Sequence, residues 1–200
     1  MTNMRAMRGV GLIEVLVALL VLSVGLLGIV GMQITAKKAN YEAVQRTSAS
    51  HLAQDLIARV RANPTGDYVD GSVLGDTALD PVNDEPDPNC YAGNSCSSDE
   101  TVAMDLFQWT LAMQGQAETR DSTATGGLVS PRACLVGPDG VSGYYKLAIV
   151  WRGTDELEPL ELGNEFCAGG LDGTDLYGSE DDPGDDSRRR VLLLEFYVTI

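Results

Sequence analysis

Residues 15–36 read VLVALLVLSVGLLGIVGMQITA, and this uncharged stretch decides the fold of the chain. As an α-helix rising about 1.5 Å per residue it would be ~33 Å long, and the hydrocarbon core of a bilayer is about 30 Å thick. A cleaved secretory signal has a shorter apolar region, of about 7–15 residues, ending at a small-x-small site. This stretch instead ends in Ala36-Lys37-Lys38, so we expect a retained membrane-spanning helix.

The chain has 200 residues and a formal net charge of −15. That length accommodates the anchor and one modest domain. A nucleic-acid partner is excluded, because phosphate binding needs clustered Lys and Arg. The one basic cluster, Arg188-Arg189-Arg190, directly follows an acidic run and is interpreted as local charge balance.

Two acidic runs are rich in Gly and Pro and are interpreted as solvated loops. Calcium is an open alternative, because clustered carboxylates suit a hard cation. Neither run has the spacing of an EF-hand loop, so no metal site and no cofactor is predicted. The first run, at 67–87, contains Asp67, Asp70, Asp76, Asp80, Asp84, Glu85 and Asp87. The second run, at 172–186, contains Asp172, Asp175, Glu180, Asp181, Asp182, Asp185 and Asp186.

All four cysteines follow the apolar stretch, and none forms a C-x-x-C pair. Zinc-ribbon and thioredoxin chemistry therefore lack their spacing. In an oxidising compartment we expect two disulfides, with three possible pairings. Cys90–Cys96 with Cys134–Cys167 is preferred, because the first pair closes a short polar loop.

Glu14 lies at the start of the apolar segment. An unpaired carboxylate within a membrane costs roughly 2.5 kcal/mol or more, and such residues are functional by default. The alternative is that Glu14 marks the membrane interface and extends into it.

The stretch Arg8-Gly9-Val10-Gly11-Leu12-Ile13-Glu14 resembles the processing site of type IV prepilins. In that family a short basic leader ends in Gly, and a Glu is the fifth residue of the mature chain. Gly9 and Glu14 match, whereas Val10 departs from the usual Phe or Met. The resemblance implies cleavage after Gly9 by the prepilin peptidase and N-methylation of Val10.

The resemblance also implies a role for Glu14 in assembly. The cationic amine of Val10 in one subunit would neutralise Glu14 of a neighbour, since a buried pair is tolerable where a lone buried charge is not. The implied location is the bacterial inner membrane, with a periplasmic C-terminal domain, followed by the pilus fibre at the cell surface.

Within the family, Glu14 to Leu19 (EVLVAL), Leu22 to Gly28 (LSVGLLG) and Gln33 look like the PilV group of type IV pilus minor pilins. The resemblance implies a part in initiating the pilus, in its tip complex, and in twitching motility and adhesion. Implied partners are the major pilin and other minor pilins, and a tip adhesin is a further candidate. The alternative is the I-type minor pseudopilin of type II secretion, which shares EVLVAL.

Gly25, Gly28 and Gly31 lie three residues apart. Each costs a helix interior about 1 kcal/mol relative to Ala. They could form a stripe that lets another helix approach closely. They could also be soft points of the helix, or ordinary membrane-helix glycines.

The same helix is predicted to continue from Val10 to about Ala62, where Asn63-Pro64 ends the pattern. The expected divisions are a leader at 1–9, a membrane or filament-core helix at 10–36, its amphipathic continuation at 37–63 and a globular domain at 64–200. Helical spacing places one broad apolar face on the continuation, comprising Ala49, Leu52, Ala53, Leu56, Ile57 and Val60.

A second helix is predicted at about 98–115, because Ser97 and Glu100 have the capping-box spacing. Strands are predicted at Arg132–Val136, Tyr144–Trp151 and Val191–Ile200 from their alternating apolar residues. Antiparallel strands with one apolar face need a cover, and the long helix supplies it. The predicted class is therefore α+β and pilin-like.

An enzyme is not favoured. His51, the one histidine of the chain, is predicted to lie on the helix as a surface residue. Asp181 and Asp182 could perform glycosidase chemistry only in a formed cleft. A single-pass sensor is a further alternative, but it would need neither Gly9 nor Glu14 at this spacing.

Overall fold

The computed structural model describes residues 11–69, 71–117, 119–120, 123–124, 126–138, 141–163, 166–167, 170–172 and 176–200. The chain divides into two compact units, the first ending at Tyr41 and the second spanning Glu42–Ile200. The first unit consists of the beginning of the long helix. The second is globular and contains the remaining secondary structure.

Helix α1 spans Leu12–Ala62, close to the predicted 10–62. No Pro interrupts it, and Asn63-Pro64 follows its last residue. Within the globular unit its apolar face is buried, as predicted, at Ala49, Ala53, Leu56 and Val60. The helix therefore supplies the hydrophobic face around which this unit packs.

Helix α2 spans Ser98–Met113 and begins with the predicted capping box. Ser97 Oγ accepts from the backbone N–H of Glu100, and the Glu100 side chain accepts from the backbone N–H of Ser97. Trp109 is fully buried, and its indole N–H donates to the backbone carbonyl of Leu52 at 2.7 Å. This bond ties α2 to α1 and satisfies the one polar atom of a large core side chain.

Three antiparallel strands form the main sheet in the order β3-β4-β5. They are β3 (Arg132–Val136), β4 (Gly143–Arg152) and β5 (Arg189–Val198). All three match the predicted strands to within about two residues. A separate two-stranded ribbon pairs β1 (Thr119–Arg120) with β2 (Thr123–Ala124), and single 3₁₀ turns lie at η1 (Cys90–Ala92) and η3 (Pro183–Asp185).

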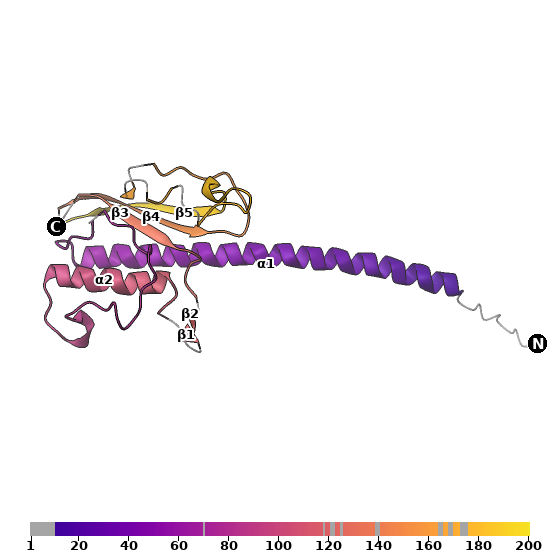
Figure 1. Cartoon of the computed structure of the whole chain (residues 1–200), viewed down its shortest axis with the longest axis horizontal. Helices are drawn as coiled ribbons and strands as arrows, with labels where there is room; N and C mark the ends of the chain where they lie inside the picture. The colour runs from indigo at the N-terminus through magenta and orange to yellow at the C-terminus, as the bar shows by residue number, and fades with distance from the viewer. Residues whose placement is uncertain are drawn as a thin grey trace, which may run out of the picture. The chain divides into compact units, whose positions relative to one another are not determined.

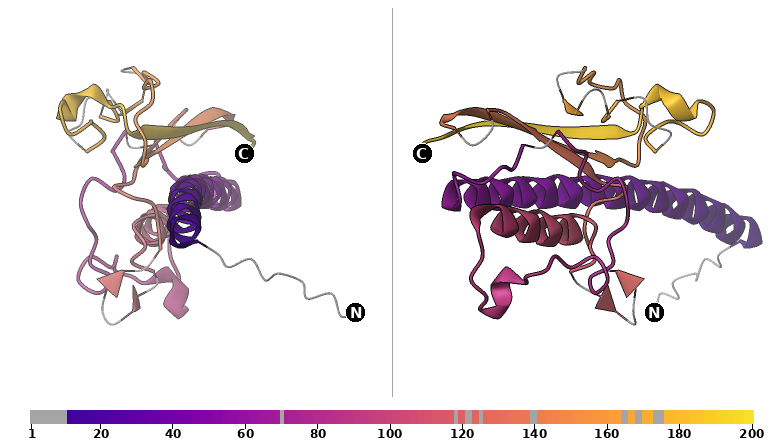
Figure 2. Two further views of the ribbon diagram at one scale, coloured as in Figure 1. Left: turned by 90° about the vertical axis from the view of Figure 1, so that its right-hand side faces the viewer. Right: turned by 60° about the vertical axis from the view of Figure 1, so that its left-hand side comes forward.

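The inner face of the sheet packs on both helices, which lie side by side beneath it (Figure 1). Figure 2 shows the same layering from two further directions. The ring of Tyr145 stacks on that of Phe196 on this face, with centroids 5.6 Å apart. The core combines these members of the helices and sheet: Ala49, Ala53, Leu56, Val60, Val102, Trp109, Met113, Leu135, Tyr145, Leu147, Ile149, Trp151, Phe196 and Val198.

The outer face of the sheet carries a second apolar layer that the sequence analysis did not predict. Ala148 and Val150 on this face are fully buried, together with Cys134 of β3. The cover comes from the irregular segment between β4 and β5, through Leu162, Phe166, Leu171 and Tyr177. The expectation that the sheet has one apolar face was therefore wrong: part of its second face is also buried.

The long N-terminal helix and the small antiparallel sheet make the fold α+β and pilin-like, as predicted.

Candidate assembly segment and polar sites

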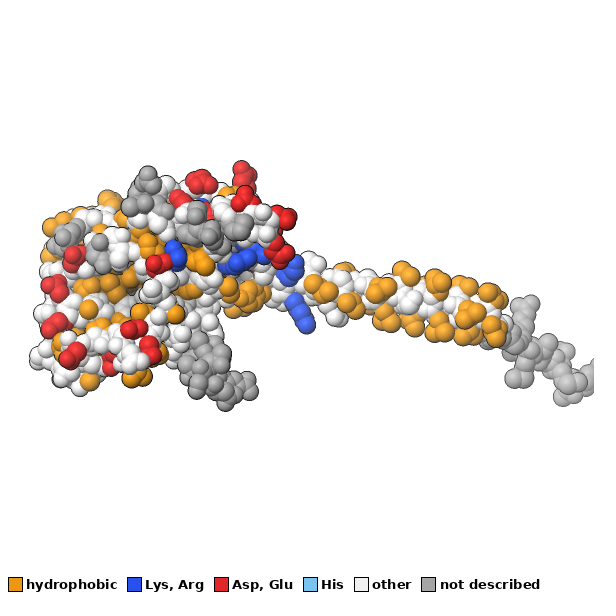
Figure 3. Space-filling model, in the orientation of Figure 1, with side chains coloured by type: hydrophobic (Ala, Val, Ile, Leu, Met, Phe, Trp, Pro, Cys, Tyr) orange, Lys and Arg blue, Asp and Glu red, His pale blue; other side chains and the backbone are white. Residues whose placement is uncertain are grey.

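The candidate assembly segment is the part of α1 in the first unit. All of its large apolar side chains are exposed, from 41% at Tyr41 to 79% at Leu12 (Figure 3). By length and composition, α1 is the one helix of the described residues that could cross a membrane. Exposed apolar surface on this scale requires lipid or other protein as its environment.

Glu14 lies in the first turn of α1, where a negative charge is favourable because of the helix dipole. It lines a shallow groove on the helix with Val15, Ala18, Leu19 and Leu22. Within the described part of the chain, its carboxylate has no hydrogen-bond or ion-pair partner. The predicted processing residues Gly9 and Val10 lie outside the described residues.

The glycines of this segment have open space around them. A Cβ atom built at Gly25, Gly28 or Gly31 would meet nothing within 4 Å. Nothing within the described chain therefore requires glycine at these three positions.

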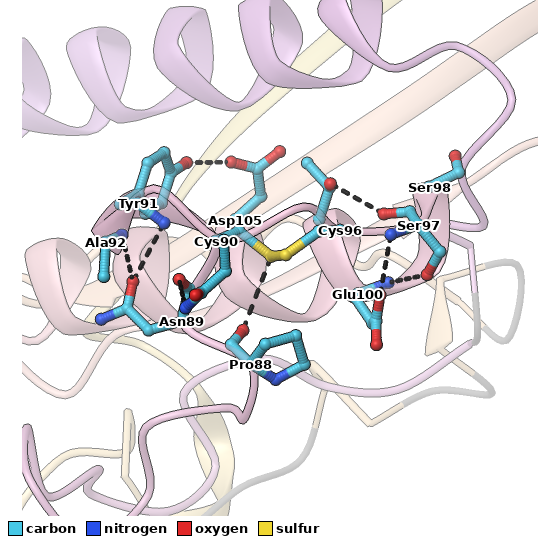
Figure 4. The surroundings of a disulfide bond; sticks show 12 residues. Pro88, Asn89, Cys90, Tyr91, Ala92, Cys96, Ser97, Ser98, Glu100 and Asp105 are labelled. Atoms are coloured by element: carbon cyan, nitrogen blue, oxygen red, sulfur yellow. Dashed lines mark hydrogen bonds between the residues drawn. A yellow bond between two sulfur atoms is a disulfide. The ribbon is translucent and has the colours of Figure 1, made fainter.

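The structure pairs the cysteines as Cys90–Cys96 and Cys134–Cys167, the arrangement preferred from the sequence. The first bond closes the loop that carries η1 (Figure 4). The second joins β3 to the segment that covers the outer face of the sheet. The second disulfide therefore fastens an irregular segment to a strand, whereas the first lies within a single loop.

Asp105 on α2 is buried and forms a polar centre between both helices and two loops. It accepts from Arg59 Nη1 at 2.9 Å and from the hydroxyls of Tyr68 and Tyr91, each at 2.5 Å. Tyr91 belongs to the loop closed by the first disulfide, and Figure 4 shows its hydroxyl directed at Asp105. Burial raises the pKa of Tyr68, and the bond to Asp105 raises it further.

Arg189 is a second buried charge, at the start of β5. Its guanidinium pairs with Asp172 and Asp186 and donates to the carbonyls of Leu171 and Leu160. Arg189 therefore holds the covering segment against the sheet. Interpreting the whole 172–186 run as solvated was wrong for Asp186, which is buried because it neutralises Arg189.

The other arginines of the basic triplet pair outside the acidic run. Arg188 pairs with Glu156 at 3.1 Å, and Arg190 pairs with Glu42 of α1 at 3.4 Å. Local charge balance therefore describes Arg189 but not its two neighbours.

Glu42 accepts two further hydrogen bonds near the start of the globular unit. Both the backbone N–H and the hydroxyl of Thr154 donate to it, at 2.5 and 2.9 Å. Burial alone would raise the pKa of Glu42, but these bonds and the charge of Arg190 outweigh burial and lower it.

Other carboxylates of the acidic loops accept hydrogen bonds from the backbone of their own loop. Asp80 accepts from the N–H groups of Val82 and Asn83, which lowers the pKa of its carboxyl. Asp185 accepts from the N–H groups of Ser187 and Ser179, and these bonds lower its pKa to about 2. No group of three His, Cys, Asp or Glu side chains among the described residues is arranged to hold a metal ion. Asp70 and Asp175 lie outside these residues.

Sequence reasoning missed the roles of Asp105, Arg189 and Glu42. Asp105 did carry a signal, because it is a charged residue three positions from Val102 on the apolar face of α2. Arg189 and Glu42 carried none, since their partners are distant in the sequence. His51 is exposed, as expected.

The long exposed helix and the helix-covered sheet define the class of protein as pilin-like. Residues 31–107 match the model of the Tt1218-like family, described as type IV pilin Tt1218. The match covers the later part of α1, the first acidic loop and most of α2, and excludes both Glu14 and the sheet. Neither a curated protein nor a solved structure matches the chain.

The family match supports a type IV pilin with a role in a pilus, alongside other pilins. The matched family is structural rather than enzymatic. The apolar helix is compatible with anchoring in a membrane followed by incorporation into a pilus.

Proposed function

We propose that this chain is a minor pilin of a type IV pilus, of the PilV group. Its leader, residues 1–9, is removed by the prepilin peptidase, and the new amine on Val10 is methylated. Residues 10–36 anchor the precursor in the inner membrane and then enter the filament core. Residues 37–63 continue that helix into the periplasmic unit at 64–200.

The observation that carries this proposal is the unpaired carboxylate of Glu14 on an exposed apolar helix. In an apolar phase such a charge is costly unless a cation meets it. With no partner for it in the described chain, the cation is expected from another subunit. The methylated amine of Val10 is the group that pilin processing would create.

The open space at Gly25, Gly28 and Gly31 supports the same role. Small residues on one side of a helix let a second helix approach closely, where dispersion contacts and weak hydrogen bonds replace lipid. This stripe would pack on neighbouring pilin helices, including that of the major pilin.

The mature N-terminus tests the processing step. Mass spectrometry of the protein from cells that contain the peptidase should find a chain starting at methylated Val10. A chain that still starts at Met1 in those cells overturns the proposal. Gly9→Leu should block cleavage without lowering the amount of precursor in the membrane.

Glu14→Gln tests the assembly step, because it removes the charge and keeps the shape. We expect processing and membrane levels to stay unchanged while the protein disappears from sheared surface fibres. A matched control is Glu158→Gln, the same change at an exposed carboxylate of the globular unit, which should leave incorporation unchanged. Wild-type incorporation of Glu14→Gln would contradict the pairing.

The second candidate, an I-type minor pseudopilin, rests on the shared stretch Glu14 to Leu19. Deletion separates the two. Loss of surface pili and twitching with secretion intact supports the minor pilin, and failed exoprotein secretion with normal piliation supports the pseudopilin.

A further inference from the structure

The two edges of the main sheet differ in how they are protected. The outer edge of β3 is occupied, because Leu74 and Ala133 exchange two backbone hydrogen bonds of 2.9 Å. At the other end of the order β3-β4-β5, the ten-residue strand β5 has no further strand beside it among the described residues. The side of β5 that faces away from β4, here called the β5 edge, is therefore the open edge of the sheet.

The strand register identifies which backbone groups lie on the β5 edge. Ala133 bonds to Leu74, so its N–H and C=O point away from β4, and those of its partner Ile149 point toward β5. Leu192 lies opposite Ile149 and exchanges bonds with it, because facing and non-facing pairs alternate along an antiparallel ladder. The alternate residues direct their N–H and C=O groups outward, and none of these groups has a hydrogen-bond partner within the described chain: Val191, Leu193, Glu195 and Tyr197.

The β5 edge also leaves apolar side chains incompletely covered. On the inner face of β4, Leu147 and Ile149 are 1% and 0% exposed. Their partners on β5, Leu194 and Leu192, are only half-buried although they pack on the same core. On the outer face of β5, Leu193 is 42% exposed. A strand added beside β5 would cover these leucines and supply partners for the outward backbone groups.

The β5 edge lacks the features that usually prevent strand pairing. Native edge strands carry Lys, Pro or a bulge that discourages a second strand. Residues 191–200 contain no Pro and one charged residue, Glu195, whereas 22% of the whole chain is charged. The pairing of β5 with β4 runs from Gly143↔Val198 to Arg152↔Arg189 without a bulge. An open, apolar and regular edge of this length is suited to the addition of a strand.

A second copy of this chain does not fit the β5 edge. Pairing with β3 of another copy is blocked, because Leu74 occupies that edge. An antiparallel pair of β5 strands is blocked by direction, since β5 and α1 run the same way within the globular unit. Glu42 pairs with Arg190 where both elements begin in this unit, and Arg61 lies over the ring of Phe196 near their ends. Two copies inserted into one bilayer from the same side have α1 helices that run in the same direction, whereas an antiparallel β5 pair would oppose them.

A parallel pair of β5 strands cannot form a symmetric dimer. A two-fold axis along the strands would place identical residues opposite each other, with the N–H and C=O groups of each directed at the other. In a parallel ladder, a residue whose groups face the partner lies opposite one whose groups face away. Because homo-oligomers are mostly closed and symmetric, the strand that fits the β5 edge belongs to a different chain.

We propose that the β5 edge binds an extended strand of another pilin subunit, which joins the sheet as its fourth strand. The incoming strand is apolar on the face beside Leu192 and Leu194. It has no acidic residue opposite Glu195, because like charges directly opposite destabilise a strand pair. This inference rests on the proposed function, in which the chain enters a fibre of other pilins, and it adds the contact made by the globular unit. Packing between the apolar helices raises the effective concentration of the two strands, so a contact of few residues suffices.

Hydrogen exchange of the full chain in phospholipid vesicles tests whether the edge is open and whether a second copy covers it. In vesicles that contain only this chain, the outward amides of Leu193 and Glu195 should exchange about a hundredfold faster than the inward amides of Leu192 and Leu194. The difference should be the same at low and high protein-to-lipid ratio. Protection of the outward amides that rises with this ratio would assign the edge to a second copy and overturn the proposal. Slow exchange of these amides at both ratios would show that the edge is not open.

A proline on the β5 edge tests docking in the fibre. Leu193→Pro removes one outward N–H and leaves the ladder to β4 intact, because proline is tolerated on the free side of an edge strand. Leu193→Thr is the matched control, since it removes the same apolar side chain and keeps the N–H. With leader cleavage and membrane levels unchanged, Leu193→Pro should lower incorporation into sheared fibres about tenfold relative to Leu193→Thr. Equal incorporation of the two variants would contradict strand addition.

A photoreactive residue detects the contact without changing the backbone. p-Benzoylphenylalanine in place of Tyr197 should cross-link, in fibres, to a strand of another pilin subunit, which mass spectrometry of the joined peptides identifies. In place of Val82, which is 80% exposed in the first acidic run, it should give no such product. A cross-link between two copies, or none in fibres that contain the chain, would overturn the proposal. Absence of the wild-type chain from fibres would instead overturn the proposed function, and with it the inference that rests on it.

Discussion

The guanidinium of Arg59 on α1 and the carboxylate of Asp105 on α2 are joined by a hydrogen bond of 2.9 Å. Arg59 also pairs with the exposed Asp55 one helical turn earlier, again at 2.9 Å. The side chain of Asp105 is 7% exposed and that of Asp55 is 48% exposed. One arginine thus offers a comparison of a buried with an exposed ion pair.

Asp105→Asn should lower the free energy of unfolding of the globular unit by about 2–3 kcal/mol. The change leaves Arg59 and two tyrosine hydroxyls around a neutral amide, and breaking a buried pair is costly. Asp55→Asn should cost less than about 1 kcal/mol, because water screens the exposed pair. Urea unfolding followed by near-ultraviolet circular dichroism measures both, and similar losses would contradict the central role of Asp105.

Alkaline pH should destabilise the unit through Tyr68. Burial first, and then the bond to Asp105, raise the pKa of Tyr68 above the unfolded value of 10.0. The folded protein favours the neutral phenol over the phenolate. The contribution of Tyr68 to the free energy of unfolding is therefore complete below pH 10 and is lost as the pH rises through the folded pKa. Tyr68→Phe should make the decline in melting temperature above pH 10 shallower, although it costs about 1 kcal/mol at pH 7. Tyr144→Phe, at an exposed tyrosine, should leave the decline unchanged.

Arg189→Met should destabilise the protein far more than Arg188→Met. Arg189 is 4% exposed, and its loss leaves buried Asp186 without a compensating charge, at a cost of about 3–5 kcal/mol. Arg188 pairs with a Glu156 side chain that is 53% exposed, so its loss should cost less than about 1 kcal/mol. Faster proteolysis between β4 and β5 in Arg189→Met would identify the covering segment as the part that opens. Equal stability of the two variants would refute this account of Arg189.

The two disulfides should differ in their contributions to stability. Cys90 and Cys96 are 6 residues apart in the sequence, and Cys134 and Cys167 are 33 apart. Loop-closure entropy gives about 2 kcal/mol for the short loop and about 4 kcal/mol for the long one. Thermal unfolding of the two double Cys→Ala variants should therefore show a larger loss for the Cys134–Cys167 pair. The reverse order would show that local packing outweighs chain entropy.

Local signals predicted the elements of the fold. The apolar stretch and the following 3.6-residue pattern located α1, Ser97 with Glu100 located the start of α2, and alternation located the strands. These signals suffice because capping, periodicity and helix breakers act within a few residues. The preferred cysteine pairing also followed from the short separation of Cys90 and Cys96.

The second face of the sheet was not predicted, although part of its signal was present. Residues 147–151 of β4 read LAIVW, a continuous apolar run, and such a run is typical of a strand buried on both faces. Its cover could not be predicted, because residues 153–188 have no periodicity. They are held by distant contacts such as that between Arg189 and the carbonyl of Leu160.

For the candidate site, the sequence located Glu14 and its surroundings, because a lone carboxylate in an apolar stretch is visible without coordinates. The polar centre at Asp105 and the buried charge of Arg189 needed the structure. Both sites are formed by side chains that are distant in the sequence. The order of residues along the chain does not show which of them come into contact.

The pair formed by Glu42 and Arg190 has a consequence for when the protein can fold. It joins residues 148 positions apart, near the first and last residues of the globular unit. Bringing such distant segments together lowers the entropy of the chain before the stabilising contacts have formed. This entropy loss slows folding. Because β5 completes the sheet, the unit cannot close until residues 189–198 have been synthesised. We therefore expect α1 to be available for insertion into a membrane while the globular unit that it supports is still unfolded.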